Sequence, residues 1–339
     1  MQKNIYVKDL NEGDRFEEIF LVKSVKSGET RTGNAYFVLT VTDKSGEVSG
    51  PIWNNVQQLQ QLCVPGETIK VKGSVQSYRD QLQLKIDSIT PIDRSAVDLG
   101  DFIPAAPGSR RKMGKRLQSL VHSVEDPFLR KLLSCFFDEG EWLHRFLEAP
   151  AAKGIHHAYV GGLLEHSLSV AAIAEFMARH YRGVNRSLLI AGALLHDIGK
   201  IEELSSRAGI IDYTVQGRLK GHIVMGNEAV ARAAGQIDNF PQEVLEQVQH
   251  IIVSHHGRRE FGSPVLPMTV EAIILSFIDD LDSKINITEQ LRHKMEGREM
   301  DFTEYQRSLE RYLYLGGLDD LDEEERPSSE LAARQQTLF

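Results

Sequence analysis

Residues 194–200, LLHDIGK, place a histidine and an aspartate side by side at the end of an apolar run. The apolar residues before them predict a buried helix. A helix that ends on His196 and Asp197 carries an imidazole and a carboxylate into the interior, where polar groups without partners are costly. Gly199 follows, and we expect it to let the chain turn away. The pair therefore needs partners from elsewhere in the chain.

The sequence on both sides of this stretch has a helical period. Apolar residues recur at spacings of three and four in segments such as RLQSLVHSV, SLSVAAIAEFMARHY, VLEQVQHIIVSHHG and VEAIILSFIDDLDSKI. This spacing is typical of amphipathic helices. We therefore expect an all-α helical bundle over residues 117–316.

Most of the twelve histidines lie in this helical part, at places where predicted helices end or turn. The chain has only two cysteines, so a metal would be held by imidazole and carboxylate. Such ligands suit Mn, Fe, Co or Ni, with Zn as an alternative. The candidates, in chain order, are His156, His157, His166, His196, Asp197, His222, His255, His256 and Asp279.

A metal centre would explain the buried acid and base. Asp197 has two oxygens and can bridge two ions, whereas His196 can bind one. His222, His255 and Asp279 would project from three other helices, as inward ligands do in helical bundles. A lone His222 could instead be a surface or core residue, and His157 and His256 stay open between ligand, phosphate contact and mere neighbour.

Residues 1–95 have a different character. From Arg15 to about Ile92 they contain short segments rich in β-branched residues and bounded by Gly or Asp turns. In residues 36–41, YFVLTV, alternate side chains can be buried on one face. About five strands, with the helix-like NNVQQLQQL between the third and the fourth, fit a small closed barrel of the OB type.

The charge is unevenly distributed. A net charge of -9 argues against a general polyanion-binding surface. Residues 1–95 are balanced, whereas residues 317–339 hold seven acidic and two basic side chains. SRRKMGKR, residues 109–116, has five basic residues and no acid. We expect residues 96–116 to be a basic linker and residues 317–339 to be an acidic, disordered tail.

The order H...HD...H...HH...D resembles the HD-domain superfamily of metal-dependent phosphohydrolases. With an amino-terminal OB domain, the chain resembles still more closely the YhaM-type bacterial 3'-to-5' exoribonucleases. The likeness reaches to about residue 315 and leaves the tail unexplained. The segments that carry it are AAKGIHHAYVGGLLEHSLSVA, LLHDIGKIEEL, GHIVMGNE, SHHGRREFGSP and FIDDLDSKIN.

The resemblance implies a ligand set. The first metal would be held by His166, His196, Asp197 and Asp279. In two-metal members the same aspartate bridges to a second ion, held here by His222 and His255. Asp280 and Asp282 are close enough in sequence to rival Asp279, and His256 is left as a ligand or substrate contact. The expected cofactor is therefore a pair of divalent ions, with Mn first and Co, Fe, Ni or Zn as alternatives.

Two ions that share a carboxylate can lower the pKa of a bridging water and clamp a phosphate oxygen. We therefore predict a 3'-to-5' exonuclease that hydrolyses phosphodiester bonds of single-stranded RNA, with DNA as a further substrate, and releases mononucleotides. The catalytic residues would be Asp197, Lys200 and His256. The lysine could instead be a solvated residue at a helix end. The expected phosphate contacts are Lys153, His156 and His157.

The barrel would hold the strand by stacking bases on aromatic rings beside basic side chains. The candidates for stacking are Tyr36, Trp53 and Tyr78, and those for phosphates are Lys72, Arg79 and Lys85. Each of them could also be an ordinary packing residue.

The last five residues, QQTLF, resemble the Q-x-x-L-F peptide by which bacterial proteins dock on the DNA polymerase sliding clamp. The matching residues are Gln335, Leu338 and Phe339. An exposed end on a disordered linker is where such a peptide can work. The alternative is an ordinary amphipathic end. If the motif is used, the exonuclease also meets DNA.

Other functions stay open at this point. The main rival is a phosphohydrolase acting on a small nucleotide, such as a cyclic dinucleotide or an alarmone. A catalytically idle nucleic-acid-binding module and a di-iron oxygenase are two more. No apolar run approaches the roughly 18 residues of a membrane span, and residues 1–10 lack a signal-peptide core. We expect a cytoplasmic protein that does not contact membranes, with a homo-oligomer left open.

Overall fold

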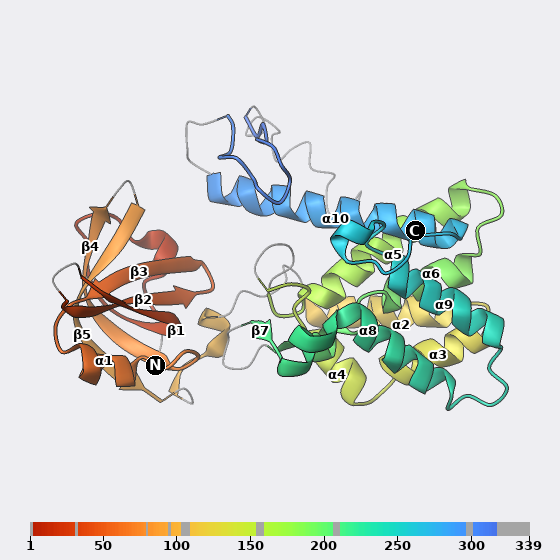
Figure 1. Ribbon diagram of the computed structural model, residues 1–339, viewed down its shortest axis with the longest axis horizontal. Coiled ribbons are helices and arrows are strands. Elements are labelled where there is room, and N and C mark those ends of the chain that lie inside the picture. The colour runs from red at the N-terminus through yellow and green to blue at the C-terminus, as the bar shows by residue number, and fades with distance from the viewer. Residues whose placement is uncertain are drawn as a thin grey trace. The chain divides into compact units, whose positions relative to one another are not determined.

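The computed structural model describes residues 3–30, 33–78, 81–93, 96–102, 109–153, 159–205, 211–295 and 301–316. The chain forms two compact units (Figure 1). The first comprises Met1–Pro107 and Ser205–Asp212, and the second comprises Gly108–Leu204 and Tyr213–Phe339. Each unit is described by itself below.

The first unit contains a closed five-stranded barrel with the strand order β1-β2-β3-β5-β4. This confirms the OB-type barrel, and a helix stands between the third and fourth strands as expected. The elements are η1 (Val7–Asp9), β1 (Arg15–Glu29), β2 (Ala35–Asp43), β3 (Gly46–Ile52), α1 (Val56–Leu62), β4 (Thr68–Tyr78) and β5 (Gln81–Ile92), followed by η3 (Leu99–Asp101).

The barrel core is built by alternation along the strands. On β2, Phe37, Leu39 and Val41 are fully buried, and the residues between them are partly exposed. Neighbouring strands contribute apolar residues of the same kind, such as Phe20 from β1 and Ile69 from β4. The alternation predicted from the sequence is thus confirmed, and it leaves every second side chain of β2 on the outer face.

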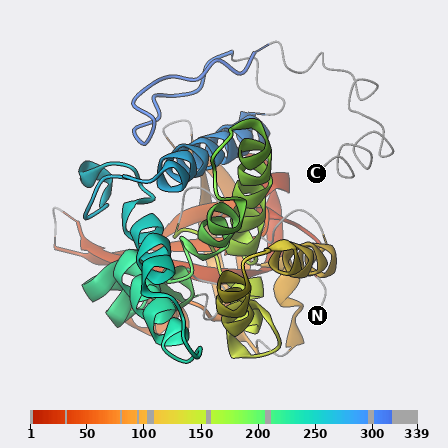
Figure 2. The ribbon, with the colours of Figure 1, turned by 90° about the vertical axis from the view of Figure 1, so that its right-hand side faces the viewer.

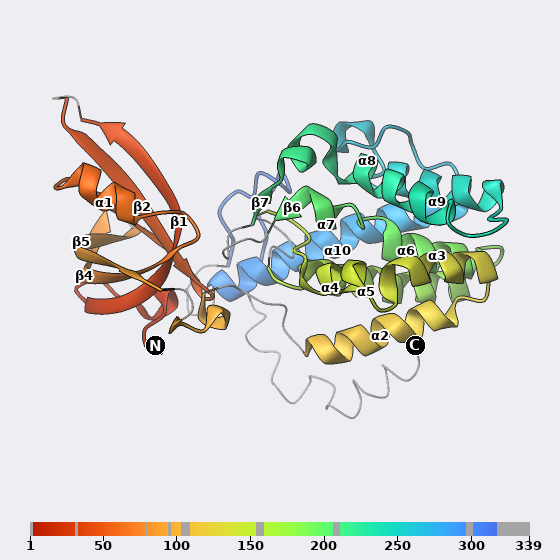
Figure 3. The same cartoon turned by 90° about the horizontal axis from the view of Figure 1, so that it is seen from below.

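The second unit is helical, as predicted. Figures 2 and 3 show its helices from two sides, with α10 packed on α5 and α6, and with α8 beside α9. The helices are α2 (Arg110–Ser123), α3 (Pro127–Phe137), α4 (Glu141–Glu148), α5 (Gly162–His180), α6 (Arg186–Leu195), α7 (Lys200–Glu203), α8 (Val215–Ala234), α9 (Gln242–Ser254), η5 (Arg259–Phe261) and α10 (Val270–Met295).

One small departure from an all-α domain occurs beside α7. The strands β6 (Leu204–Ser205) and β7 (Asp212–Tyr213) form a two-stranded sheet. The backbone N–H of Thr214 donates to the carbonyl oxygen of Glu203, and the Thr214 hydroxyl donates to that of Glu202. These bonds fix the start of α8 against the end of α7.

The expected linker differs in its second half. α2 begins at Arg110, so residues 110–116 lie in a helix rather than in an extended connector. The reason is that Leu117 and Val121 are buried in the helical core, and Met113 packs against it one turn earlier. Apolar residues at this spacing extend the helix back into the basic run.

α6 lies at the centre of the helical unit. All its residues from Leu188 to Leu195 are buried, and it contacts α3, α5, α9 and α10. Its C-terminal end therefore opens into the interior of the bundle. In the described part of the chain, no helix is long and apolar enough to cross a membrane.

Some predicted residues lie outside the described part of the chain. They are Arg79, His156, His157, Gln335, Leu338 and Phe339, the last three within residues 317–339.

Candidate metal centre

Six predicted residues come together where five helices meet. His166 projects from the first turns of α5, Asp279 lies on α10, and His222 lies on α8. His196 and Asp197 follow the last residue of α6, and His255 caps the end of α9. Four of the six, His166, His196, Asp197 and His255, are almost completely buried.

The turn after α6 explains why histidine and aspartate stand next to each other. His196 is the C-cap residue, and its backbone is still helical. Gly199 is also helical, with φ of -65°, so it does not serve to turn the chain away as we expected. A Cβ at this position would collide with the carbonyl oxygen of His222. The glycine instead lets α8 approach and bring its histidine beside Asp197.

The two oxygens of Asp197 face two groups of histidines. Oδ1 lies 3.5 Å from Nε2 of His222 and 3.5 Å from Nε2 of His255. Oδ2 lies 3.4 Å from Nε2 of His196 and 3.7 Å from Nε2 of His166. The carboxylate therefore stands between two clusters of nitrogen donors.

Asp279 completes the first cluster. Its Oδ1 lies 3.1 Å from Nε2 of His166 and 3.8 Å from Nε2 of His196. The two imidazole nitrogens are themselves 3.2 Å apart. Two nitrogen lone pairs at this separation repel each other unless a proton or a cation lies between them.

Every histidine of the centre is oriented through its other ring nitrogen. Nδ1 of His196 donates to the carbonyl oxygen of Ala193 at 2.9 Å, and Nδ1 of His255 donates to that of Ile252 at 2.7 Å. A carbonyl can only accept, so the proton is on Nδ1, and Nε2 carries the lone pair when such a ring is neutral. Histidine ligands of metals are held in this way.

Carboxylates orient the other two histidines. Nδ1 of His166 lies 2.7 Å from Oδ2 of Asp282, and Ser169 donates to the second oxygen of that carboxylate. Nδ1 of His222 lies 3.1 Å from the carboxylate of Glu203. Asp282, the sequence rival of Asp279, thus contacts the side of His166 that faces away from the cluster, and it positions the imidazole.

The donor set fits a divalent cation. Among the described residues, Oδ1 of Asp197 and the Nε2 atoms of His222 and His255 are buried without any hydrogen-bond partner. Leaving three such atoms unsatisfied is costly, and a bound cation would satisfy all of them. Ligand atoms close enough to share an ion occur in two groups, His166 with His196 and Asp197, and His222 with His255 and His256.

The electrostatics of the centre follow from burial and from the close charges. Burial opposes ionisation of Asp197, but Lys200 and His196 outweigh it and hold the pKa of the carboxyl well below its usual range. Burial also opposes the charge of His166, yet Asp279 and Asp282 raise its pKa to about 9. Burial opposes ionisation of Asp279 too, but His166 and His196 outweigh it and hold the pKa of that carboxyl well below its usual range. Both carboxylates are thus ionised at neutral pH, which suits them to bind a cation.

The second cluster behaves differently. Burial lowers the pKa of His255, and burial together with the neighbouring His255 lowers the pKa of His256 to about 4. Neutral imidazoles offer lone pairs at neutral pH. Nδ1 of His256 donates to the carbonyl oxygen of Phe261 at 2.7 Å, so its Nε2 is available like that of His255.

Lys200 is not a solvated lysine at a helix end. It is 8% exposed, and its Nζ lies 2.6 Å from Oδ2 of Asp197. Burial opposes its charge, but Asp197 outweighs this and raises its pKa. The positively charged ammonium group of Lys200 is thus held beside the predicted metal centre.

The sequence alone does not identify Glu203, and it suggests Asp282 only as an alternative metal ligand to Asp279. Glu203 binds His222 twice, because Oε1 also accepts the backbone N–H of that residue at 2.9 Å. The signal was present in HDIGKIEEL, where an acidic pair follows the motif by one helical turn. Only the fold shows which of these carboxylates reaches a histidine.

On the barrel, the predicted nucleic-acid-binding residues that the structure describes lie on the outside. Trp53 is 55% exposed and stacks on Tyr36, with ring centroids 4.6 Å apart. An added Cβ at Gly28 would meet the ring of Tyr36, so this ring packs on the strand and supports the tryptophan. Tyr78 is also 55% exposed.

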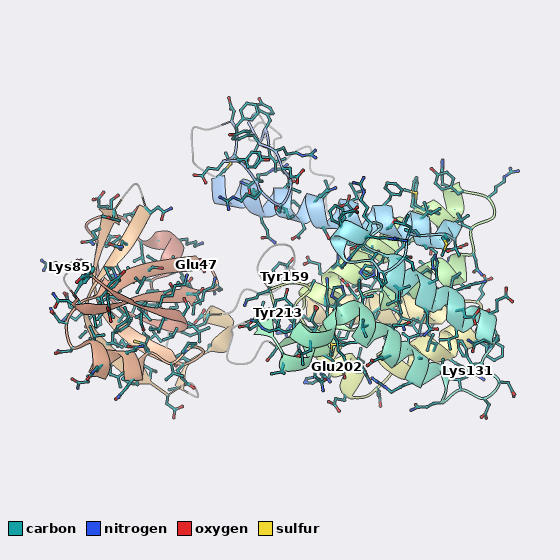
Figure 4. All side chains as sticks on the ribbon, viewed as in Figure 1. Glu47, Lys85, Lys131, Tyr159, Glu202 and Tyr213 are labelled. Atoms are coloured by element: carbon teal, nitrogen blue, oxygen red, sulfur yellow. The ribbon has the colours of Figure 1, made fainter. Side chains whose placement is uncertain are left out.

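The two described basic candidates, Lys72 and Lys85, also point outward from the barrel. Val71, Gly73 and Val75 of β4 are buried, so Lys72 and Tyr78, which alternate with them, point outward. Ser49 of β3 pairs in parallel with Gln83 of β5, and Trp53 and Lys85 follow these residues by four and two positions. Even spacing places both on the same side of the sheet, and Figure 4 shows Lys85 at the edge of the barrel.

The fold and the centre define a class of protein. The family model described as "HD domain" matches residues 163–284, which contain every histidine and aspartate of the two clusters. The family model described as "OB-fold nucleic acid binding domain" matches residues 21–92. The chain therefore combines an HD domain with an OB-fold domain.

Curated relatives narrow the class. The 3'-5' exoribonuclease YhaM of Geobacillus sp. (strain WCH70) is 33% identical over 299 residues, which cover 88% of this chain and 90% of that protein. The protein of the same name from Bacillus subtilis (strain 168) is 34% identical over 291 residues, or 86% of this chain and 91% of that protein. The chain belongs to this YhaM family, as its motifs predicted.

Proposed function

We propose that this chain hydrolyses single-stranded RNA from its 3' end and releases mononucleotides at the centre around Asp197. The observation that carries the proposal is the position of this carboxylate between two clusters of Nε2 atoms. The curated relatives are named for the same activity. A small-nucleotide phosphohydrolase is less favoured, because hydrolysis of a small nucleotide would not need the exposed aromatic and basic residues of the barrel.

The donor set supports two divalent ions. His166, His196, Asp197 and Asp279 would hold the first, and Asp197, His222 and His255 the second, with His256 as a further donor. Nitrogen and carboxylate donors without sulfur favour Mn, with Co, Fe, Ni and Zn as alternatives. When bound, such ions supply a hydroxide near neutral pH and polarise a phosphoryl oxygen.

The chain's own residues then perform the remaining tasks. Asp282 and Glu203 hold the imidazoles of His166 and His222 so that their Nε2 atoms point inward. Lys200 carries a fixed positive charge next to Asp197 and would attract the phosphate. Lys153 would meet a phosphate further along the strand. His156 and His157 remain proposed phosphate contacts outside the described residues.

The barrel would bind the strand. Trp53 offers an exposed ring that is supported by stacking on Tyr36, and Lys72 and Lys85 also point outward from the barrel. Base stacking and backbone contacts read little sequence, so we expect weak selectivity among bases and some activity on DNA. Tyr78 and Arg79 would extend this surface.

The direction of hydrolysis is tested with single strands labelled at the 5' end or at the 3' end, as RNA and as DNA. With Mn²⁺, the 5' label should pass through a ladder of products that shorten by one nucleotide, and the 3' label should appear at once in mononucleotide. Internal cuts, or release of the 5' label first, would refute the proposed direction. A preference for a cyclic dinucleotide over the strand would favour the rival substrate.

The carboxyl end supports a second interaction. We propose that QQTLF, through Gln335, Leu338 and Phe339, docks on the DNA polymerase sliding clamp. Replacing both Leu338 and Phe339 by Ala should remove binding to the purified clamp, whereas Thr337→Ala is the matched control. A parent protein that does not bind the clamp, or a double variant that still binds it, would remove the idea.

A further inference from the structure

Tyr213 stands out on the surface of the helical unit, close in sequence to the metal centre. It is 41% exposed, and Figure 4 shows it at the end of the unit that also carries Tyr159. Two apolar residues in the first turns of α8 also face solvent, since Val215 and Leu219 are 77% and 80% exposed, among exposed polar and charged neighbours. Apolar side chains so exposed at one place mark a surface that binds something.

Two cations flank the ring of Tyr213. Nζ of Lys153 lies 5.8 Å from the ring centroid, and Cζ of Arg218 lies 5.5 Å from it. Both distances are close to the outer limit for attraction between a cation and an aromatic ring, roughly 6 Å. Exposed rings beside positive side chains are what proteins use to stack bases and bind their phosphates without reading sequence.

The backbone next to Tyr213 is tied to α7, close to the metal centre. Thr214, the next residue, is bonded to the carbonyl oxygens of Glu202 and Glu203 at 2.8 Å each, and it caps α8 by accepting the N–H of Gly217. The side chain of Glu203 in turn holds His222. The residue after Tyr213 is therefore bonded to the backbone of Glu203, the residue whose carboxylate orients a predicted ligand.

The separation suits a strand that runs from this ring into the centre. Val215 and His222 are seven residues apart on α8, which is about 10 Å along a helix axis. Gly221, with φ of 74°, bends the helix just before the histidine. The last few nucleotides of a strand can span this length.

We propose that Tyr213, with Lys153 and Arg218, forms a base-stacking subsite for a nucleotide a few positions upstream of the 3' end that is cut. The subsite deepens the proposed exonuclease function and rests on it for the polarity of the strand. Its ligand is one base with its adjacent phosphates. It would bind the strand within the helical unit itself.

The test measures binding of 5'-fluorescein-labelled RNA 10-mers by anisotropy, with chelator present so that no strand is cut. One strand is intact, and four others each lack one base at one of the four 3'-terminal positions. With the parent protein, one of these abasic strands should bind about tenfold more weakly than the intact strand, which lies within the range that one stacked base contributes. Tyr213→Ala should bind the intact strand about tenfold more weakly and show no further loss at that position.

Two more variants keep the result interpretable. Tyr213→Phe retains the ring and should restore the affinity of the parent. Tyr181→Ala removes another exposed tyrosine of the same unit, 52% exposed at the end of α5, and should bind every strand as the parent does. Losses that simply add at all four positions, or a Tyr213→Ala protein that binds like the parent, would overturn the subsite.

The outcome is separable from that of the proposed function. If the parent shows the positional effect with chelator but never shortens a strand with Mn²⁺, the subsite stands and the exonuclease activity fails. If it shortens strands from the 3' end but shows no positional effect, the activity stands and the subsite fails.

Discussion

At the scale of single residues, the centre depends on side chains that never touch the reacting atoms. Each imidazole is held through Nδ1, either by a carbonyl of its own turn or by a carboxylate from another element. A ring that can rotate loses the inward lone pair for part of the time. Removing such a partner of a metal ligand costs roughly 10- to 100-fold in metal affinity or activity.

Asp282→Ala is therefore expected to weaken Mn²⁺ binding by about 10- to 100-fold while leaving the fold intact. The physical reason is the loss of the 2.7 Å bond that orients His166. Calorimetric titration of the metal-free protein with Mn²⁺ measures the effect.

The matched control lies two residues away on the same helix. Asp280 is exposed and pairs with Lys284 on the helix surface. Asp280→Ala should bind Mn²⁺ as the parent does. Equal affinities for the Asp282→Ala protein and the parent would show that the aspartate does not position the ligand.

At the scale of elements, a charged network joins three helices behind the centre. Glu175 of α5 is 7% exposed and accepts from Arg186 of α6 at 2.9 Å and from Arg179 at 3.1 Å. Arg186 also donates to the carbonyl and the hydroxyl of Ser123, at the end of α2. The network holds α6, and with it the HD turn, in a fixed position.

Glu175→Gln should lower the free energy of unfolding at pH 7 by about 1–3 kcal/mol, because it leaves the arginines without their charged partner. Burial alone would raise the pKa of Glu175, but Arg186 outweighs it and lowers the pKa. This contribution is thus complete above the unfolded pKa of about 4.3 and is lost as the pH falls through the lower folded value. Urea unfolding between pH 3 and pH 7 measures it.

The variant should therefore show a flatter loss of stability on the acid side than the parent. Glu228→Gln is the control, since Glu228 pairs with Lys220 at the surface, where exposed pairs contribute about 0–1 kcal/mol. Equal acid profiles for the parent and the Glu175→Gln protein would contradict the role of this network.

On the barrel, the prediction concerns the stacked rings of Tyr36, on β2, and Trp53, which follows β3. Trp53→Ala removes the exposed ring that stacks on Tyr36. Binding of a labelled RNA 12-mer should therefore weaken about 5- to 150-fold, the range for loss of one aromatic stack. Anisotropy with chelator present measures the affinity. Val64→Ala, at another exposed apolar residue of the same unit, should have no effect. No loss in the Trp53→Ala protein, or an equal loss in both variants, would contradict base stacking on this ring.

At the scale of the whole molecule, much of the architecture is readable from local patterns. Burial of Phe37, Leu39 and Val41 follows from a period of two, and the buried run of α6 follows from its apolar composition. His196 and Asp197 can be recognised as functional candidates because polar residues rarely end a buried apolar helix without binding a partner. These features depend on residues close together in the chain.

Other features depend on contacts that a pattern does not encode. The role of Glu203 is decided by which face of His222 it meets, and that of Gly199 by the approach of α8. The basic run at 110–116 has the composition of a linker, yet the apolar side chains after it extend a helix through it. Such outcomes follow from tertiary packing, which composition and spacing alone do not reveal.

The central claim is that the buried histidines and aspartates around Asp197 form the metal-dependent centre of an exonuclease. The most direct test measures release of 3'-terminal mononucleotide from single-stranded RNA by the parent and by Asp197→Ala, across a titration of Mn²⁺ into chelator-treated protein. The parent should be inactive without metal and recover as Mn²⁺ is added, whereas the variant should stay inactive at every concentration. Activity of the chelator-treated parent, or of the variant, would contradict the account.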